Sequence, residues 1–201
     1  MPTRSCRAIL SVLLAASLLF SLAAPLLSAE PSAPRPTVLL DEARERLRTG
    51  QQAEALELID QAAQTIWNRM GLSIPTALLT HEKAQGYGIY NPRDDNVYAK
   101  GQPVQAYLEP VGYRVREVQP GLFVFGVSVD VAILRPAGEV VWGKENFFQK
   151  TVESRRFNRD FYLTITLNIS GAPPGDYVLK FTVRDKQGVA PAEARLPIRI
   201  R

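Results

Sequence analysis

Cysteine is almost absent from this sequence. The one thiol, Cys6, lies near the start of the chain and precedes an apolar run. Disulfide bonds, a cysteine nucleophile and a thiolate metal site are therefore excluded for everything that follows that run. The remaining domain has to be stabilised by an ordinary hydrophobic core.

Histidine is equally scarce, because His81 is the only one in the chain. A metal site built on several imidazoles is impossible, and a Ser-His-Asp triad would have to use this residue. No Gly-x-Ser-x-Gly motif accompanies it. We therefore predict no catalytic residue, no metal ion and no cofactor.

A large excess of positive charge is also missing. The chain has 24 basic and 20 acidic residues and a formal net charge of +4. Two of the basic residues, Arg4 and Arg7, fall in the first 29 residues, and without that segment the net charge is about +2. Nucleic-acid binders normally carry a far larger basic excess, so we expect no nucleic-acid partner.

The one long hydrophobic run lies at the N-terminus. Arg4 and Arg7 precede the apolar residues Ala8 to Leu27, an arrangement typical of an export signal, here over residues 1–29. About 20 apolar residues would also suffice for an uncleaved membrane anchor. Pro25 and the serines within the run favour cleavage. Both readings predict an extracytoplasmic chain, periplasmic or secreted, with membrane contact only if the segment is retained.

The next segments read as a Pro-rich tether over residues 30–37 and a helical hairpin over residues 38–71. Apolar residues recur at helical spacing in two stripes, with Gly50 between them and Gly71 after them. The stripes are Leu40, Ala43 and Leu47, then Leu56, Ile59, Ala63, Ile66 and Met70.

The segment from Gly50 to Leu56 resembles the turn and second helix of a tetratricopeptide repeat. Only one copy is present, whereas a solenoid needs about three or more repeats to bury its faces. Two interpretations stay open: the apolar stripe packs on the neighbouring domain, or it receives a helix or peptide of a partner.

Residues 75–201 show a two-residue hydrophobic period, which predicts half-buried β-strands. The clearest segments are 123–133, 161–169 and 177–183, and shorter candidates are 86–90, 104–108, 139–145 and 196–200. Turn sequences rich in proline and glycine separate them. The predicted fold is mainly β, an antiparallel sandwich of about seven strands preceded by the helical hairpin.

The stretch from Ala172 to Asp185 resembles the penultimate strand of immunoglobulin-like and fibronectin-type sandwiches in exported bacterial proteins, and the likeness spans residues 75–201. It implies structural roles for Gly175 and for Tyr177, whose hydroxyl would bond back to the main chain. Because the paired cysteines of antibody domains are absent, Trp142 cannot be the tryptophan that packs on a disulfide. The resemblance implies a fold and no particular activity.

Two sets of residues are candidates for binding a protein or an envelope glycan. Tyrosines gather around three glycines, and arginines gather in a predicted loop that Lys150 joins. The tyrosines could instead be buried and the arginines simply solvated. The candidates are Tyr87, Tyr90, Tyr107 and Tyr113, and Arg155, Arg156 and Arg159.

We therefore expect an exported, non-catalytic binding or assembly module of the cell envelope. One alternative is a periplasmic hydrolase that uses His81 or the loop of Asp94 and Asp95, where oxygen ligands could also surround a calcium ion. Another is an inhibitor of extracellular proteases, a role that some sandwiches of this kind have.

Overall fold

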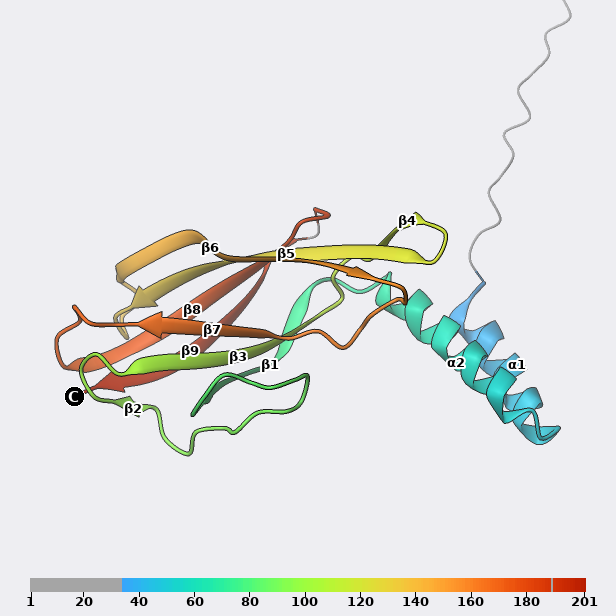
Figure 1. The fold of residues 1–201 in the computed structure, drawn as a ribbon, viewed down its shortest axis with the longest axis horizontal. Helices are drawn as coiled ribbons and strands as arrows, with labels where there is room; N and C mark the ends of the chain where they lie inside the picture. The colour runs from blue at the N-terminus through green and yellow to red at the C-terminus, as the bar shows by residue number, and fades with distance from the viewer. Residues whose placement is uncertain (1–33, 189) are drawn as a thin grey trace, which may run out of the picture. The chain divides into compact units, whose positions relative to one another are not determined.

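The computed structural model describes residues 34–188 and 190–201 (Figure 1). The predicted signal segment, residues 1–29, lies outside this range. The described chain contains two helices followed by nine strands. The predicted mainly β class and the preceding helices are thereby confirmed, although the first helix begins within the predicted tether.

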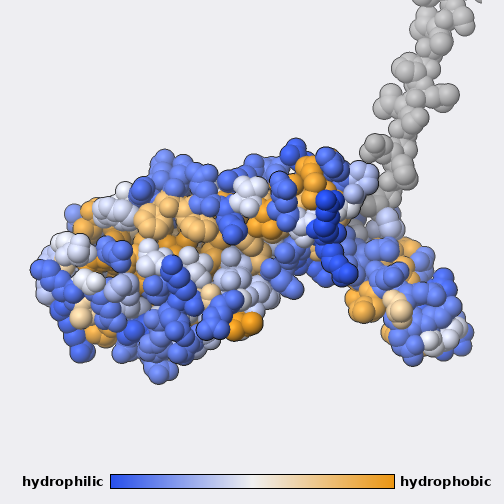
Figure 2. All heavy atoms as spheres, in the orientation of Figure 1, coloured by the Kyte–Doolittle hydropathy of each residue, from blue (hydrophilic) through white to orange (hydrophobic). Residues whose placement is uncertain are grey.

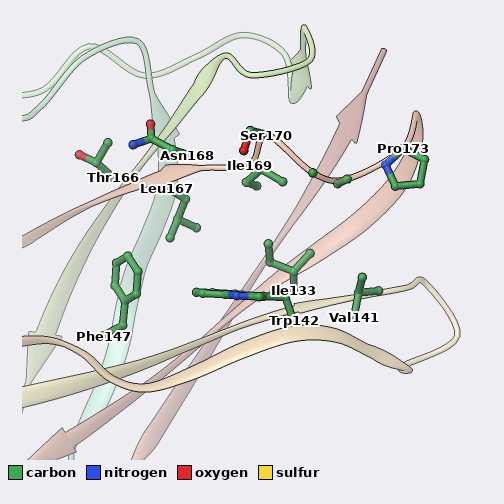
Figure 3. Close-up of a pocket in the computed structure, with 12 residues that line it drawn as sticks. Ile133, Val141, Trp142, Phe147, Thr166, Leu167, Asn168, Ile169, Ser170 and Pro173 are labelled. Carbon is green, nitrogen blue, oxygen red and sulfur yellow. The ribbon is translucent and has the colours of Figure 1, made fainter.

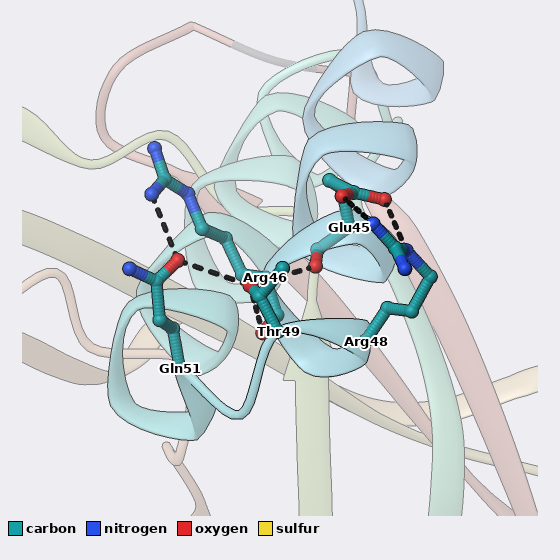
Figure 4. Close-up of polar contacts among 5 residues, drawn as sticks. All are labelled: Glu45, Arg46, Arg48, Thr49 and Gln51. Carbon is teal, nitrogen blue, oxygen red and sulfur yellow. Dashed lines mark hydrogen bonds and ion pairs between the residues drawn. The ribbon is translucent and has the colours of Figure 1, made fainter.

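The two helices are α1 (Pro36–Arg48) and α2 (Gln52–Trp67). Pro36 suits the first turn of α1, where its missing N–H has no helical partner to lose. At the other end, the hydroxyl of Thr49 donates to the carbonyl of Glu45 at 3.1 Å, and Gly50 turns the chain with a φ of 78°. Figure 4 shows this turn, where Arg48 also bonds both carboxylate oxygens of Glu45.

Small side chains bring the helices together. Apart from Trp67, which packs on Tyr113, the buried positions are Leu39 and Ala43 in α1 and Ala55 and Ala62 in α2. Alanine allows two helix backbones to approach closely. Of the eight residues in the predicted stripes, Ala43 is buried and Ala63 and Met70 are half-buried, whereas the other five are exposed: Leu40, Leu47, Leu56, Ile59 and Ile66. The interpretation that the stripe packs on the neighbouring domain is therefore wrong for these five residues.

The strands form two sheets. The small sheet has the order β1-β3-β7, and both of its pairings are antiparallel. The large sheet has the order β2-β9-β8-β5-β4. Strand β6 also belongs to it and pairs with β5 along the edge opposite β8. The strands of the small sheet are β1 (Ser73–Thr80), β3 (Pro103–Val111) and β7 (Leu163–Asn168). Those of the large sheet are β2 (Val97–Tyr98), β4 (Arg116–Gln119), β5 (Leu122–Leu134), β6 (Val140–Ser154), β8 (Gly175–Asp185) and β9 (Ala192–Ile200).

Four details of the predicted sheet are corrected. The described strands number nine, not about seven, and β2 runs parallel to β9. Residues 86–90 form a turn closed by one bridge between Gly86 and Ile89, because the two glycines favour a turn over a strand. The candidate strand 139–145 continues to Ser154, which places Lys150 in a strand and not in a loop.

One hydrophobic cluster draws side chains from both sheets. Phe125, Phe181, Ile165 and Leu108 are all buried in it, from β5, β8, β7 and β3. The predicted inward faces of the three long strands are thus confirmed. This shared core fixes the position of the loops and edges described below.

Candidate functional site

The four candidate tyrosines separate into different environments. The Tyr107 ring, fully buried on the side of β3 away from the core, lies 4.3 Å from the Tyr90 ring and 5.6 Å from the Tyr162 ring. Its hydroxyl donates to Glu109 Oε1 at 2.6 Å and accepts the Gly88 N–H at 2.9 Å. These bonds hold the turn of residues 86–90 against the small sheet. Of the four candidate tyrosines, Tyr87 is the exposed one, with a relative accessibility of 41%.

Tyr113 belongs to the hydrophobic core. Its ring stacks on Phe125 at 4.7 Å and meets the Trp67 ring edge-on at 5.0 Å. The indole N–H of Trp67 donates to the Tyr113 carbonyl at 2.8 Å, and the Tyr113 hydroxyl donates to the Asn158 carbonyl at 3.0 Å. Tyr113 therefore joins the end of α2 to the β domain and presents no surface to a ligand.

The buried tyrosines make the stability of the fold sensitive to alkali. Burial, with the nearby Asp160 charge, raises the pKa of Tyr113, and burial with the Glu109 hydrogen bond raises that of Tyr107. These raised pKa values add to the free energy of unfolding. Their contribution is complete below the unfolded-state pKa of about 10 and is lost as the pH rises above it. We expect the melting temperature to fall above about pH 10, and to fall less steeply in Tyr113→Phe. Equal slopes for the two proteins between about pH 9 and 11 would contradict this assignment.

The predicted arginine loop is not a single free patch. Arg155 and Arg156 are exposed beyond the end of β6. Arg159 instead makes an ion pair and hydrogen bond with Asp60 of α2. One of the three arginines thus fastens the loop to the helical hairpin, and the other two stay candidates for binding.

The loop of His81, Asp94 and Asp95 is held by local hydrogen bonds. The Arg93 guanidinium binds Asp95 Oδ1 at 2.6 Å, and the same oxygen accepts the Val97 N–H at 3.2 Å. These bonds, that of Arg93 first, lower the pKa of the Asp95 carboxyl. Within residues 34–188 and 190–201, no three histidine, cysteine or acidic side chains gather closely enough to hold a metal ion.

The three residues expected to be structural, Tyr177, Gly175 and Trp142, lie in different environments. The Tyr177 hydroxyl donates to the Pro173 carbonyl at 2.8 Å, which is the main-chain bond that the resemblance implies, and Gly175 has a φ of 153°. Trp142 is not a core residue, because it is 41% exposed and contacts Phe147 edge-on at 6.1 Å. The structure places Trp142 in a cleft.

An apolar helix face is exposed on the hairpin, and Figure 2 shows it as orange atoms over the helices. Its five residues are between 40% and 67% exposed: Leu40, Leu47, Leu56, Ile59 and Ile66. On a helical wheel with 100° per residue, all five residues are rotated in the same direction from the buried residues that face the partner helix. Because the two helices run antiparallel in the hairpin, the five residues lie on one side of the helix pair. The periodicity revealed these residues, although not their exposure.

A cleft separates β6 from β7. Its larger cavity has a volume of about 560 Å³, and a second cavity of about 310 Å³ is also lined by both strands. In Figure 3, Leu167 of β7 points toward Phe147 of β6, and Trp142 lies beside Ile133. Sequence reasoning missed this cleft because its two walls come from different sheets.

No helix in the described part of the chain has the length and hydrophobicity that crossing a membrane requires. This finding concerns residues 34–188 and 190–201 and does not extend to the predicted signal segment.

No protein-family model and no curated protein matches this chain. Several solved structures are weakly similar. The C-terminal domain of Wzt aligns with 66% of this chain and 75% of its own, at 17% identity and a TM-score of 0.40. The sporulation control protein Spo0M from Bacillus subtilis covers 66% of this chain, which spans half of that protein, at 9% identity and a TM-score of 0.39.

A third similar structure is the Pseudomonas fluorescens alkylpurine DNA glycosylase AlkC bound to DNA with an abasic site analog. It covers 83% of this chain and 43% of its own, at 11% identity and a TM-score of 0.35. None of these similarities assigns a family or a function to this chain.

Proposed function

We propose that this protein is an exported, non-catalytic assembly module of the cell envelope, with an immunoglobulin-like β domain that carries a helical hairpin. The observation that carries the proposal is the exposed apolar face of the hairpin. Five large apolar side chains there lack cover from the described residues, with Leu56 67% exposed. Contiguous apolar surface of this kind is typical of an interaction site.

The occupant that we propose for this face is the hairpin of a second copy. Two hairpins related by a two-fold axis parallel to the helices would form a four-helix bundle, in which α1 of one copy packs on α2 of the other. Arg44 borders the face on α1, and Asp60, which also pairs with Arg159 of its own chain, borders it on α2. This arrangement places Arg44 of one copy beside Asp60 of the other along both edges.

The oligomeric state of residues 30–201 tests the proposal. Light scattering after size-exclusion chromatography is expected to give a dimer. The double variant Leu56→Glu with Ile59→Glu is expected to be a monomer, since burying two carboxylates in the interface raises Kd by about 100-fold or more. Its circular dichroism is expected to be unchanged, because both side chains are exposed in the single chain.

Gln61→Glu is the matched control, because Gln61 is exposed on the other side of α2. This variant is expected to remain a dimer. A monomeric parent protein at about 100 μM, or a double variant that dimerises like the parent, would rule out the four-helix bundle.

A further inference from the structure

The two sheets differ in width, and β6 extends beyond the small sheet. Register pairs Phe125 with Val152, Val129 with Phe148 and Ile133 with Trp142. Directly paired residues of antiparallel strands lie on the same face of a sheet, so all three β6 side chains share the core-facing side. The β5 partners are buried, whereas Phe148 and Val152 are half-buried and Trp142 is exposed. The inner face of β6 is thus only partly covered.

On the opposite wall of the cleft lies an unpaired strand edge. Among the described residues, β7 pairs with β3 and with no other strand. Every second residue of β7 therefore directs its N–H and C=O groups away from β3. Its buried side chains Leu163, Ile165 and Leu167 face the core. A further strand beside β7 would cover the inner face of β6.

The two cavities lie one after the other along the space between β6 and β7. The larger one lies between Trp142 and Phe147 of β6 and Leu167 of β7, and the smaller one between Phe148 and Val152 of β6 and Leu163 of β7. In Figure 2, a band of hydrophobic atoms runs between the positions that Figure 1 gives to β6 and β7. We call this β6–β7 space the seam.

We propose that the seam accepts one extended segment of a partner polypeptide, which adds to β7 as a fourth, antiparallel strand of the small sheet. Main-chain hydrogen bonds to β7 would hold the segment, and its alternate apolar side chains would fill the two cavities. This site is separate from the hairpin and does not depend on dimerisation.

The unpaired edge of β7 and the two cavities beside it favour a lone strand as the occupant. A strand added to β7 would lie about 4.8 Å from it, over the cavities that both β6 and β7 line. An edge strand of a second folded copy would bring its own sheet with it, whereas a lone segment needs only the space beside β7. The partner therefore supplies a flexible arm or a terminus.

The charges at one end of the seam indicate which residues the bound partner segment should carry there. Lys83 and Lys150 line the smaller cavity, where Asp160 is the one acidic side chain among its lining residues. Arg155 and Arg156 are exposed beyond the end of β6. An antiparallel segment reaches this end with its C-terminal residues. We therefore expect large apolar residues at alternate positions, no proline among them, and acidic residues at the C-terminal end.

Binding of labelled peptides to residues 30–201 tests the proposal by fluorescence anisotropy. The probe alternates threonine with leucine and valine and ends in two glutamates. A second peptide has proline at a central threonine, which removes a main-chain donor, and a third ends in two lysines. The first peptide is expected to bind about tenfold or more tightly than either of the others. Equal affinities, or no binding of any peptide at about 1 mM, would overturn the proposal.

Variants and hydrogen exchange locate the site. Lys150→Glu is expected to weaken binding about tenfold, whereas Lys100→Glu, an exposed residue beyond β2, leaves it unchanged. Bound peptide is expected to slow amide exchange in β7. Protection at β1, β2 or β4 instead, or protection of β7 that grows with protein concentration alone, would overturn the proposal. The variant Leu56→Glu with Ile59→Glu is expected to bind the peptide normally, so this test is independent of the hairpin.

Discussion

Gly112→Ala is expected to lower the free energy of unfolding by roughly 3 to 5 kcal/mol. Gly112 has a φ of 77°, and a Cβ atom there would lie 2.3 Å from the Gly71 carbonyl oxygen. The backbone of Gly71 follows α2 and cannot move without shifting the hairpin. The substitution therefore adds a steric collision with main chain to the strain of a left-handed conformation. Urea unfolding followed by circular dichroism measures the loss.

Gly101→Ala is the matched control for this substitution. Gly101 has nearly the same φ, 78°, but no atom lies within 4 Å of a Cβ placed there. It tests the conformational cost alone, which we expect to be about 1 kcal/mol. If both variants lost the same stability, the close approach of Gly112 to Gly71 would not be what requires glycine.

Trp67→Ala is expected to destabilise the protein by about 3 to 5 kcal/mol. The Trp67 ring is buried against Tyr113, and its N–H donates to the Tyr113 carbonyl at 2.8 Å. Alanine leaves a cavity at the junction between hairpin and β domain and removes the donor. The hairpin is also expected to separate more readily, so limited proteolysis should cut the chain faster between residues 68 and 72.

Trp142→Ala provides the comparison within the same residue type. Trp142 is 41% exposed and lines the open cleft, so its loss is expected to cost less than about 1 kcal/mol. Equal destabilisation by the two substitutions would mean that Trp67 is not the main anchor of the hairpin.

The fold class could be predicted from the sequence because alternation is a local property. Phe125, Ile165 and Phe181 each belong to a two-residue rhythm that a single strand reveals, and all three are buried. The parallel pairing of β2 with β9 could not be predicted. Two residues carry no periodicity, and a pairing between distant segments depends on the whole topology.

The candidate sites were harder to predict, because exposure depends on tertiary packing. Helical periodicity identified Leu56 and Ile59 correctly as one stripe but not which side of α2 faces α1. The alanines at positions 55 and 62 made that contact, although small residues give a weak hydrophobic signal. Lys144 and Lys150 interrupt the inner face of β6, so its full length, and with it one wall of the seam, went unpredicted.

The strand order also implies a sequence of folding events. β5 with β6 and β8 with β9 are neighbours along the chain and can form early. The small sheet needs β3 and β7, whose residues Gln105 and Thr166 are bonded across 61 positions, so closing that loop delays it. We expect the whole domain to fold in milliseconds to seconds, with the hairpins of the large sheet formed first and the edge at β7 ordered last.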